Sequence, residues 1–303
     1  MRPASSPLTL AILSAAILFG SGGSGGIGFY APRPAQAAEG DARAASKSGY
    51  HLFRPTPNDL LRDLSTDRPD LTESPYTVDA GHVQLEMDLV GYARDDEGDT
   101  RAESWGVAPI NLKFGLTPSA DLQIVVETHR RDRATDLVTG ERFDASGFGD
   151  VTLRLKRNVW GNDAGATAFA LMPFVKLPTA ADAIGNGAVE GGLILPLAVA
   201  LPSDFGLGVM GEMDWLEDGD GEGHHAEWVG TATVGRDVAG PFGAFVEIAA
   251  AARPEREGNT IATLDIGMTA ALSSNAQLDG GVLLGVSDDA DDRAFFLGLS
   301  LRR

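Results

Sequence analysis

The sequence predicts an all-β protein: a transmembrane, up-and-down antiparallel β-barrel of about 12 strands, preceded by an irregular N-terminal periplasmic arm. Three observations predict this fold. Apolar and polar residues alternate with period two from about residue 78 onward, the connections are alternately short and long, and the N-terminus has the form of an export signal. These features divide the chain into a signal peptide (1–37), the arm (38–77) and the barrel (78–303).

The export signal is predicted from three consecutive features. Arg2 supplies a positive charge, residues 8–19 form an apolar run, and Ala35-Gln36-Ala37 matches an A-x-A cleavage motif. The apolar run is too short to cross a bilayer as a helix, and no other run is longer. We therefore expect cleavage near Ala37 and a mature chain that lacks a transmembrane helix.

The alternating pattern is clearest where Val83, Leu85 and Met87 alternate with Gln84 and Glu86. Similar segments, each about 10 to 14 residues long, follow one another to the C-terminus. A tilted strand of about 9 to 11 residues crosses the hydrocarbon, whereas strands of soluble proteins are nearer five or six. Segment length therefore favours a barrel. A soluble periplasmic β-sandwich binding protein stays an alternative, because it would also carry its charges on one face.

The connections support the barrel because their lengths alternate. The short ones are residues 117–119, 161–163, 202–204, 237–241 and 273–275, and the long polar ones are 94–103, 132–147, 178–187, 217–225, 254–259 and 288–293. Short periplasmic turns and longer external loops are typical of membrane barrels. An even number of strands would place both termini at the periplasmic end.

Composition excludes several other classes of protein. The net charge is -19, which argues against nucleic acid as a partner, and the absence of cysteine excludes disulfides and thiolate metal sites. The acidic run 217–223 is similar to a calcium loop, but Val229 stands where an EF-hand needs glutamate. We expect a solvated loop there, and neither a metal site nor a cofactor.

An enzymatic role is not expected. Outer-membrane hydrolases need a serine activated by a histidine. His82 and His129 lie on candidate strands, but no serine occupies a matching position.

Charged residues on the polar faces of the predicted strands are candidates for the lumen. They could form a charged pathway that sets solute selectivity, or simply neutralise one another in a polar interior. The candidate lumen and selectivity residues are Lys113, Glu127, Arg154, Lys156, Lys176, Glu212, Asp214, Glu247 and Asp265.

The most specific motif lies in the arm. Residues 66–75 read Thr-Asp-Arg-Pro-Asp-Leu-Thr-Glu-Ser-Pro and lead into V-x-x-G-x-x-Q-x-E at 78–86. This opening strongly resembles that of exported β-barrels in the family called "Putative MetA-pathway of phenol degradation". One departure is the C-terminal Leu301-Arg302-Arg303, where outer-membrane barrels usually end in an aromatic residue.

The resemblance implies an outer-membrane channel or transporter for small, hydrophobic or aromatic molecules. We expect passive diffusion through a polar interior, gated by the arm; a non-conducting structural or surface-interaction barrel is the alternative. The arm motif would act as a gate or as a structural lock in which Arg68 bridges carboxylates; its candidate residues are Thr66, Asp67, Arg68, Pro69, Asp70 and Glu73. Expected partners are outer-membrane lipid, the barrel-assembly machinery and a small solute. The sequence predicts no particular oligomeric state.

Overall fold

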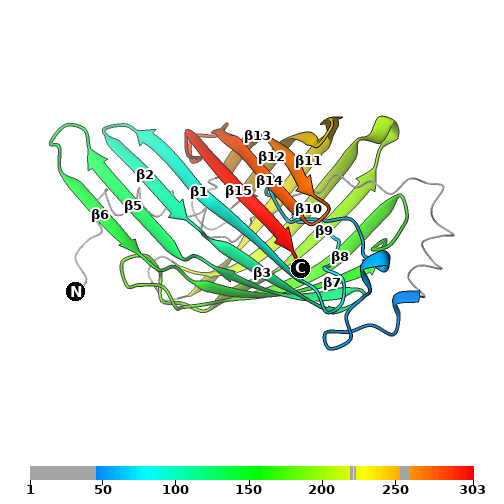
Figure 1. Ribbon diagram of the computed structural model, residues 1–303. Helices are drawn as coiled ribbons and strands as arrows, with labels where there is room; N and C mark the ends of the chain where they lie inside the picture. Colours follow the sequence, from blue (N-terminus) through cyan, green and yellow to red (C-terminus); the bar gives the residue numbers. More distant parts are fainter. Residues whose placement is uncertain (1–45, 219–220, 222, 253–259) are drawn as a thin grey trace.

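The computed structural model describes residues 46–218, 221, 223–252 and 260–303, so the predicted signal peptide lies outside the described residues. Fifteen strands in the described part form one antiparallel sheet, which closes on itself where β15 pairs with β1 (Figure 1). The strands are β1 (Val83–Glu97), β2 (Thr100–Val107), β3 (Ile110–Thr117), β4 (Ala120–Val126), β5 (His129–Asp136), β6 (Arg142–Gly147), β7 (Val151–Trp160), β8 (Thr167–Leu177), β9 (Glu190–Ala200), β10 (Gly206–Glu217), β11 (His224–Ala239), β12 (Phe242–Ala252), β13 (Thr260–Ser273), β14 (Ala276–Gly285) and β15 (Arg293–Arg302).

Three barrel strands are interrupted halfway, which reconciles these fifteen segments with the predicted count. β2 and β3, β4 and β5, and β6 and β7 are each the two halves of one strand. The result is a closed 12-stranded antiparallel barrel, which confirms the predicted fold class. Closure pairs the backbone groups of the full-length part of the wall within the protein; among the described strands, the half strand β6 pairs only with β5.

The interruptions lie side by side, and the one between β2 and β3 has a local cause. Ala108 adopts a φ of 53°, and Pro109 has no backbone N–H to donate to a ladder. Across the break, Val107 pairs with His129 and Ile110 pairs with Val126. β3 therefore begins at Ile110, and β4 and β5 are separated at residues 127–128, where the backbone leaves the strand conformation.

Two expected long loops are mostly strand. Residues 94–103 form the tips of β1 and β2, and 132–147 include parts of β5 and β6. These tips are polar on both faces, which resembles a loop in sequence. They pair as hairpins joined by cross-strand ion pairs, such as Arg131–Asp144 at 2.7 Å and Arg101–Asp96 at 2.6 Å.

The two faces of the wall differ as a membrane barrel requires. Apolar residues on the outer face stay exposed, including Ile248 at 61% and Val282 at 44%. Aromatic residues gather near both rims on this face: Trp105, Trp215, Trp228 and Phe295 near one, Trp160 and Phe242 near the other. The inner face is largely polar, and the described part has only small apolar clusters such as Met172 with Ile194 and Met210.

The first part of the described arm (46–65) and the C-terminus lie at the end of the barrel that has the short turns (Figure 1). By the arrangement usual in membrane barrels this is the periplasmic end. No helix in the described residues has the length and apolarity to cross a membrane.

Candidate functional site

The arm ends in a buried segment inside the barrel, residues 66–75, which we call the plug segment. Pro69 and Pro75 cannot donate a backbone hydrogen bond, so the segment does not join the sheet. Its buried polar side chains must therefore find partners on the inner wall. They are Thr66, Asp67, Arg68, Asp70, Thr72, Glu73 and Ser74.

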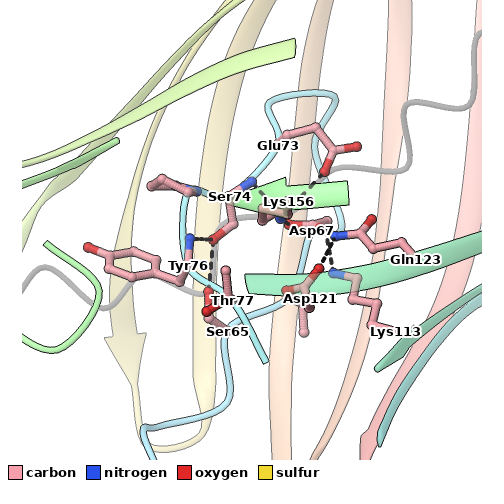
Figure 2. Close-up of polar contacts among 12 residues, drawn as sticks. Ser65, Asp67, Glu73, Ser74, Tyr76, Thr77, Lys113, Asp121, Gln123 and Lys156 are labelled. Carbon is pink, nitrogen blue, oxygen red and sulfur yellow. Dashed lines mark hydrogen bonds and ion pairs between the residues drawn. The ribbon is translucent and has the colours of Figure 1, made fainter. Parts of the chain in front are cut away.

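Asp67 joins the plug segment to one half of the barrel (Figure 2). Its carboxylate forms ion pairs with Lys113 of β3 and Lys156 of β7, and it accepts a hydrogen bond from Gln123 of β4 at 3.2 Å. Its backbone N–H donates to the carboxylate of Glu86 on β1, at 3.0 Å to Oε2. A single arm residue thus contacts four strands.

Arg68 points the other way and joins β1 to β14. Its Nη2 lies 2.5 Å from Asp88 and 2.9 Å from Asp279, and its guanidinium lies over the ring of Phe296 at 5.5 Å. Gly298 leaves the space for this, because a Cβ there would lie 2.0 Å from Nη2. Arg68 therefore occupies the carboxylate-bridging position expected for a lock.

The distal part of the plug segment is held by β11 and β12. The Glu247 carboxylate accepts the N–H of Leu71 at 2.7 Å, and the N–H and hydroxyl of Thr72 at 2.9 and 2.5 Å. The hydroxyl of Thr72 also lies 2.6 Å from that of Thr231. On the other side, Glu73 accepts from Arg154 of β7 at 2.7 Å. The segment is consequently fastened around the circumference of the lumen.

A second attachment holds the arm at the periplasmic rim. Asp79 pairs with Lys47 at 3.1 Å and with Arg62 at 3.2 Å, and both cations also reach Asp163 in the turn after β7. Burial opposes ionisation of the Asp79 carboxyl, but Arg62 and then Lys47 outweigh it and hold its pKa below its ordinary value. Asp79 therefore stays a carboxylate that clamps the arm.

A cavity of about 100 Å³ lies beside the plug segment. Its apolar lining includes Leu71 of the plug segment with Leu283 and Phe296 of the wall. It extends to the strand interruptions, where Pro109 and Glu127 line it. The cavity thus lies between the plug segment and the irregular part of the wall.

The structure places the sequence-predicted lumen residues in three groups. Lys113, Arg154, Lys156 and Glu247 contact the plug segment, as described above. Lys176 pairs instead with Glu190 at 2.6 Å and Asp150 at 3.2 Å, and Glu127 lines the cavity. Glu212 and Asp214 lie on the inner wall of β10, and Asp265 of β13 lines the cavity and lies opposite Glu247.

Several contacting residues were absent from the predicted site. Gln123, Thr231 and Asp279 bind the plug segment, and Lys47 and Arg62 clamp the rim. The wall residues could have been found from period two alone, because Gln123 and Thr231 share the inward parity of a charged neighbour on their strands and Asp279 is itself the charged residue on the polar face of β14. Lys47 and Arg62 carry no such signal, since they lie outside the strands. Within the described residues no group of three or more His, Cys, Asp or Glu is arranged to hold a metal ion.

The barrel is closed, with an apolar outer face, a polar inner face and a segment of its own chain in the lumen. These features define a transmembrane β-barrel built like the outer-membrane channels. The chain belongs to the family described as "Putative MetA-pathway of phenol degradation", whose model matches residues 66–302. The match begins at the first residue of the plug segment. The family predicted from the arm motif is thereby confirmed.

Solved structures are similar to this chain, and the first of them shares its fold. The COG4313 outer membrane channel from Pseudomonas putida F1 is similar at a TM-score of 0.57 and 14% identity, over 78% of this chain and 99% of that one. The NanC porin gives 0.46 at 10% identity, over 72% and 98%. The CymD monoaromatic hydrocarbon channel gives 0.42 at 10% identity, over 73% and 87%. No curated protein matches the sequence.

Proposed function

We propose that the protein is an outer-membrane channel through which small hydrophobic or aromatic molecules diffuse passively, with the plug segment as its gate. In this proposal it catalyses no reaction, its surroundings are outer-membrane lipid, and the barrel-assembly machinery inserts it after signal cleavage near Ala37. The observation that carries the proposal is the plug segment itself, which lies across the lumen and is held there mainly by ion pairs and hydrogen bonds, with Leu71 as its apolar contact to the wall.

The nature of these contacts supports a gate. A permanent closure could be built from apolar packing, which gains most when water is excluded. Asp67 and Arg68 instead rely on ion pairs and hydrogen bonds, whose net contribution is small once competing hydration is counted. Such a segment can be displaced without exposing a large apolar surface.

The cavity beside the plug segment supports a small apolar solute. Apolar cavities of about 150 Å³ can bind benzene, and this one measures about 100 Å³, close to the size of one small ring. The description of the family refers to phenol degradation, and the similar Pseudomonas structure is an outer membrane channel. The first agrees with a small aromatic solute and the second with a channel.

Single-channel recording tests the proposal, because a solute that enters the lumen interrupts the ion current. We expect the full chain in a planar bilayer to pass current in bursts, and benzyl alcohol to shorten the open periods more than glycerol does. Leu71→Asn in the cavity should weaken the effect of benzyl alcohol. Leu137→Asn, in an exposed loop, is the matched control and should leave it unchanged.

Two results would contradict the proposal in different ways. Absence of current from both the full chain and an Asp67→Asn variant would favour the non-conducting structural barrel. Current that responds equally to benzyl alcohol and glycerol would leave a channel but remove the aromatic solute.

A further inference from the structure

The inner wall separates its charges by side. On β10 to β14 the buried charged residues are all acidic: Glu212, Asp214, Glu227, Glu247, Asp265 and Asp279. The described residues of these five strands include one Lys or Arg, Arg236, which is exposed and stacks over Phe205 near the periplasmic turn. One half of the lumen wall is therefore lined by carboxylates alone.

The basic side chains of the opposite half are already neutralised. Lys113 and Lys156 pair with Asp67, Arg154 pairs with Glu73, and Lys176 pairs with Glu190. In contrast, no Lys or Arg in the described chain lies within 4.0 Å of the carboxylates of Glu212, Asp214, Glu247 or Asp265. The lumen thus carries a surplus of acidic groups on one side.

The register makes this surplus costly for folding. Asp214 lies directly opposite Glu227 across β10 and β11, and Glu247 lies directly opposite Asp265 across β12 and β13. Like charges in directly opposed positions destabilise a sheet. A single lysine at one of these positions would relieve the repulsion. The acidic pairs therefore indicate a role in the lumen other than stabilising the barrel.

The acidic wall also has unused acceptor capacity. Asp265 is 2% exposed, and no Lys or Arg among the described residues forms an ion pair with its carboxylate. One oxygen each of Glu212 and Asp214 is likewise buried without a partner in that part of the chain. Carboxyl groups without a cation partner keep acceptor capacity for a solute that donates a hydrogen bond.

We propose that the acidic wall of β10 to β14 makes the channel select against anions, so that its solutes are neutral or cationic small molecules and not carboxylates or other anions of the same size. The proposal rests on the proposed channel function and names the substrate class of the same lumen. Carboxylates between low-dielectric walls concentrate cations and repel anions. They also offer acceptors to a solute hydroxyl or ammonium group, which a carboxylate solute cannot use.

Reversal potentials in a KCl gradient test this proposal directly on the full chain. We expect K⁺ to permeate over Cl⁻ by about tenfold, the low end of the enrichment that a charged cleft gives, and the preference to grow at lower ionic strength. Size-matched aromatic probes should follow the same order: benzylammonium and benzyl alcohol interrupt the current, and benzoate does not.

A triple variant assigns the effect to this wall. Glu212→Gln/Asp214→Asn/Asp265→Asn should lower the K⁺ to Cl⁻ ratio at least twofold and admit benzoate. Asp182→Asn/Asp204→Asn/Asp288→Asn removes the same three charges from exposed positions and should leave the ratio unchanged. If the triple variant does not fold, the K⁺ to Cl⁻ ratio and the order of the aromatic probes, measured on the unaltered chain, still decide whether the lumen selects against anions.

The outcomes separate this inference from the proposed function. A conducting channel with equal K⁺ and Cl⁻ permeability, or with benzoate as effective as benzylammonium, overturns the inference and leaves the channel. A drop in selectivity only in the exposed-charge variant would also overturn it. A barrel that conducts neither ion removes the proposed function, and the inference with it.

Discussion

Asp67 shows how one residue can decide the position of the plug segment. Its carboxylate lies between two lysines from different strands, and all three side chains are buried. Removing one partner of a buried ion pair leaves an uncompensated charge, which costs far more than the pair contributes.

Replacing this carboxylate is therefore predicted to destabilise the barrel. Asp67→Asn should lower the free energy of unfolding by about 3–5 kcal/mol, because Lys113 and Lys156 then lose an anion. Urea titration in detergent, followed by tryptophan fluorescence, measures the change. Asp59→Asn, at an exposed arm position, is the control. Equal midpoints for the two variants would show that the ion pairs do not stabilise the fold.

Gly298 provides a second prediction at this scale. Gly298→Ala places a Cβ 2.0 Å from Nη2 of Arg68, so the guanidinium must leave Asp279 and the plug segment should loosen. We expect longer open bursts in single-channel recordings. Gly211→Ala, where a Cβ meets nothing within 4 Å, serves as the matched control. Identical recordings for both variants would mean that Arg68 does not hold the gate.

The charged residues of the site could be predicted from sequence, but their pairing could not. Period two places Lys113, Lys156 and Glu247 on the inner face, and the arm motif singles out Asp67. Which of them meet depends on barrel closure, which brings together residues up to 211 positions apart, as in Arg68 with Asp279. No local pattern encodes that distance.

At the scale of elements, the strands were predictable where one face is apolar and the other polar. They were missed where both faces are polar, as in the tips of β1, β2, β5 and β6, because cross-strand ion pairs replace the apolar signal there. The interruption after β2 was also missed, although Pro109 was visible. The proline did not indicate that three neighbouring strands break at the same level.

The rim clamp of the arm should respond to acid. Because the pKa of Asp79 is lowered in the folded state, its stabilising effect is present above its unfolded pKa, about 3.9, and is lost as the pH falls through the lowered value. A nitroxide on Phe53→Cys, a position 87% exposed in a chain without other cysteine, reports arm mobility by EPR. We expect mobility to rise as the pH falls from 4 towards 2.

The variant Asp79→Asn separates this clamp from other titrating groups. It should already be mobile at pH 7 and show a smaller rise in acid. If its spectra match those of the parent at every pH, Asp79 does not clamp the arm.

At the scale of the whole molecule, the inner face of the barrel and the plug segment together enclose one lumen. The wall is a closed sheet with an apolar exterior. The family model matches residues 66–302, which include both the plug segment and the wall. As a closed barrel, the folded protein should migrate faster than the boiled protein on gels and fractionate with membranes. A mature protein found wholly in the soluble fraction would contradict this.

In the proposed function, the plug segment closes the channel and its displacement opens it. Thr72 and Thr231 are suited to a reversible lock, because their hydroxyl oxygens lie 2.6 Å apart and the chain contains no cysteine. The most direct measurement is the single-channel current of Thr72→Cys/Thr231→Cys before and after reduction, with Thr72→Cys alone as the control. We predict that the oxidised protein stays closed and that reduction restores bursts of current, whereas the control is unaffected. Equal current in the oxidised and reduced states would contradict the account.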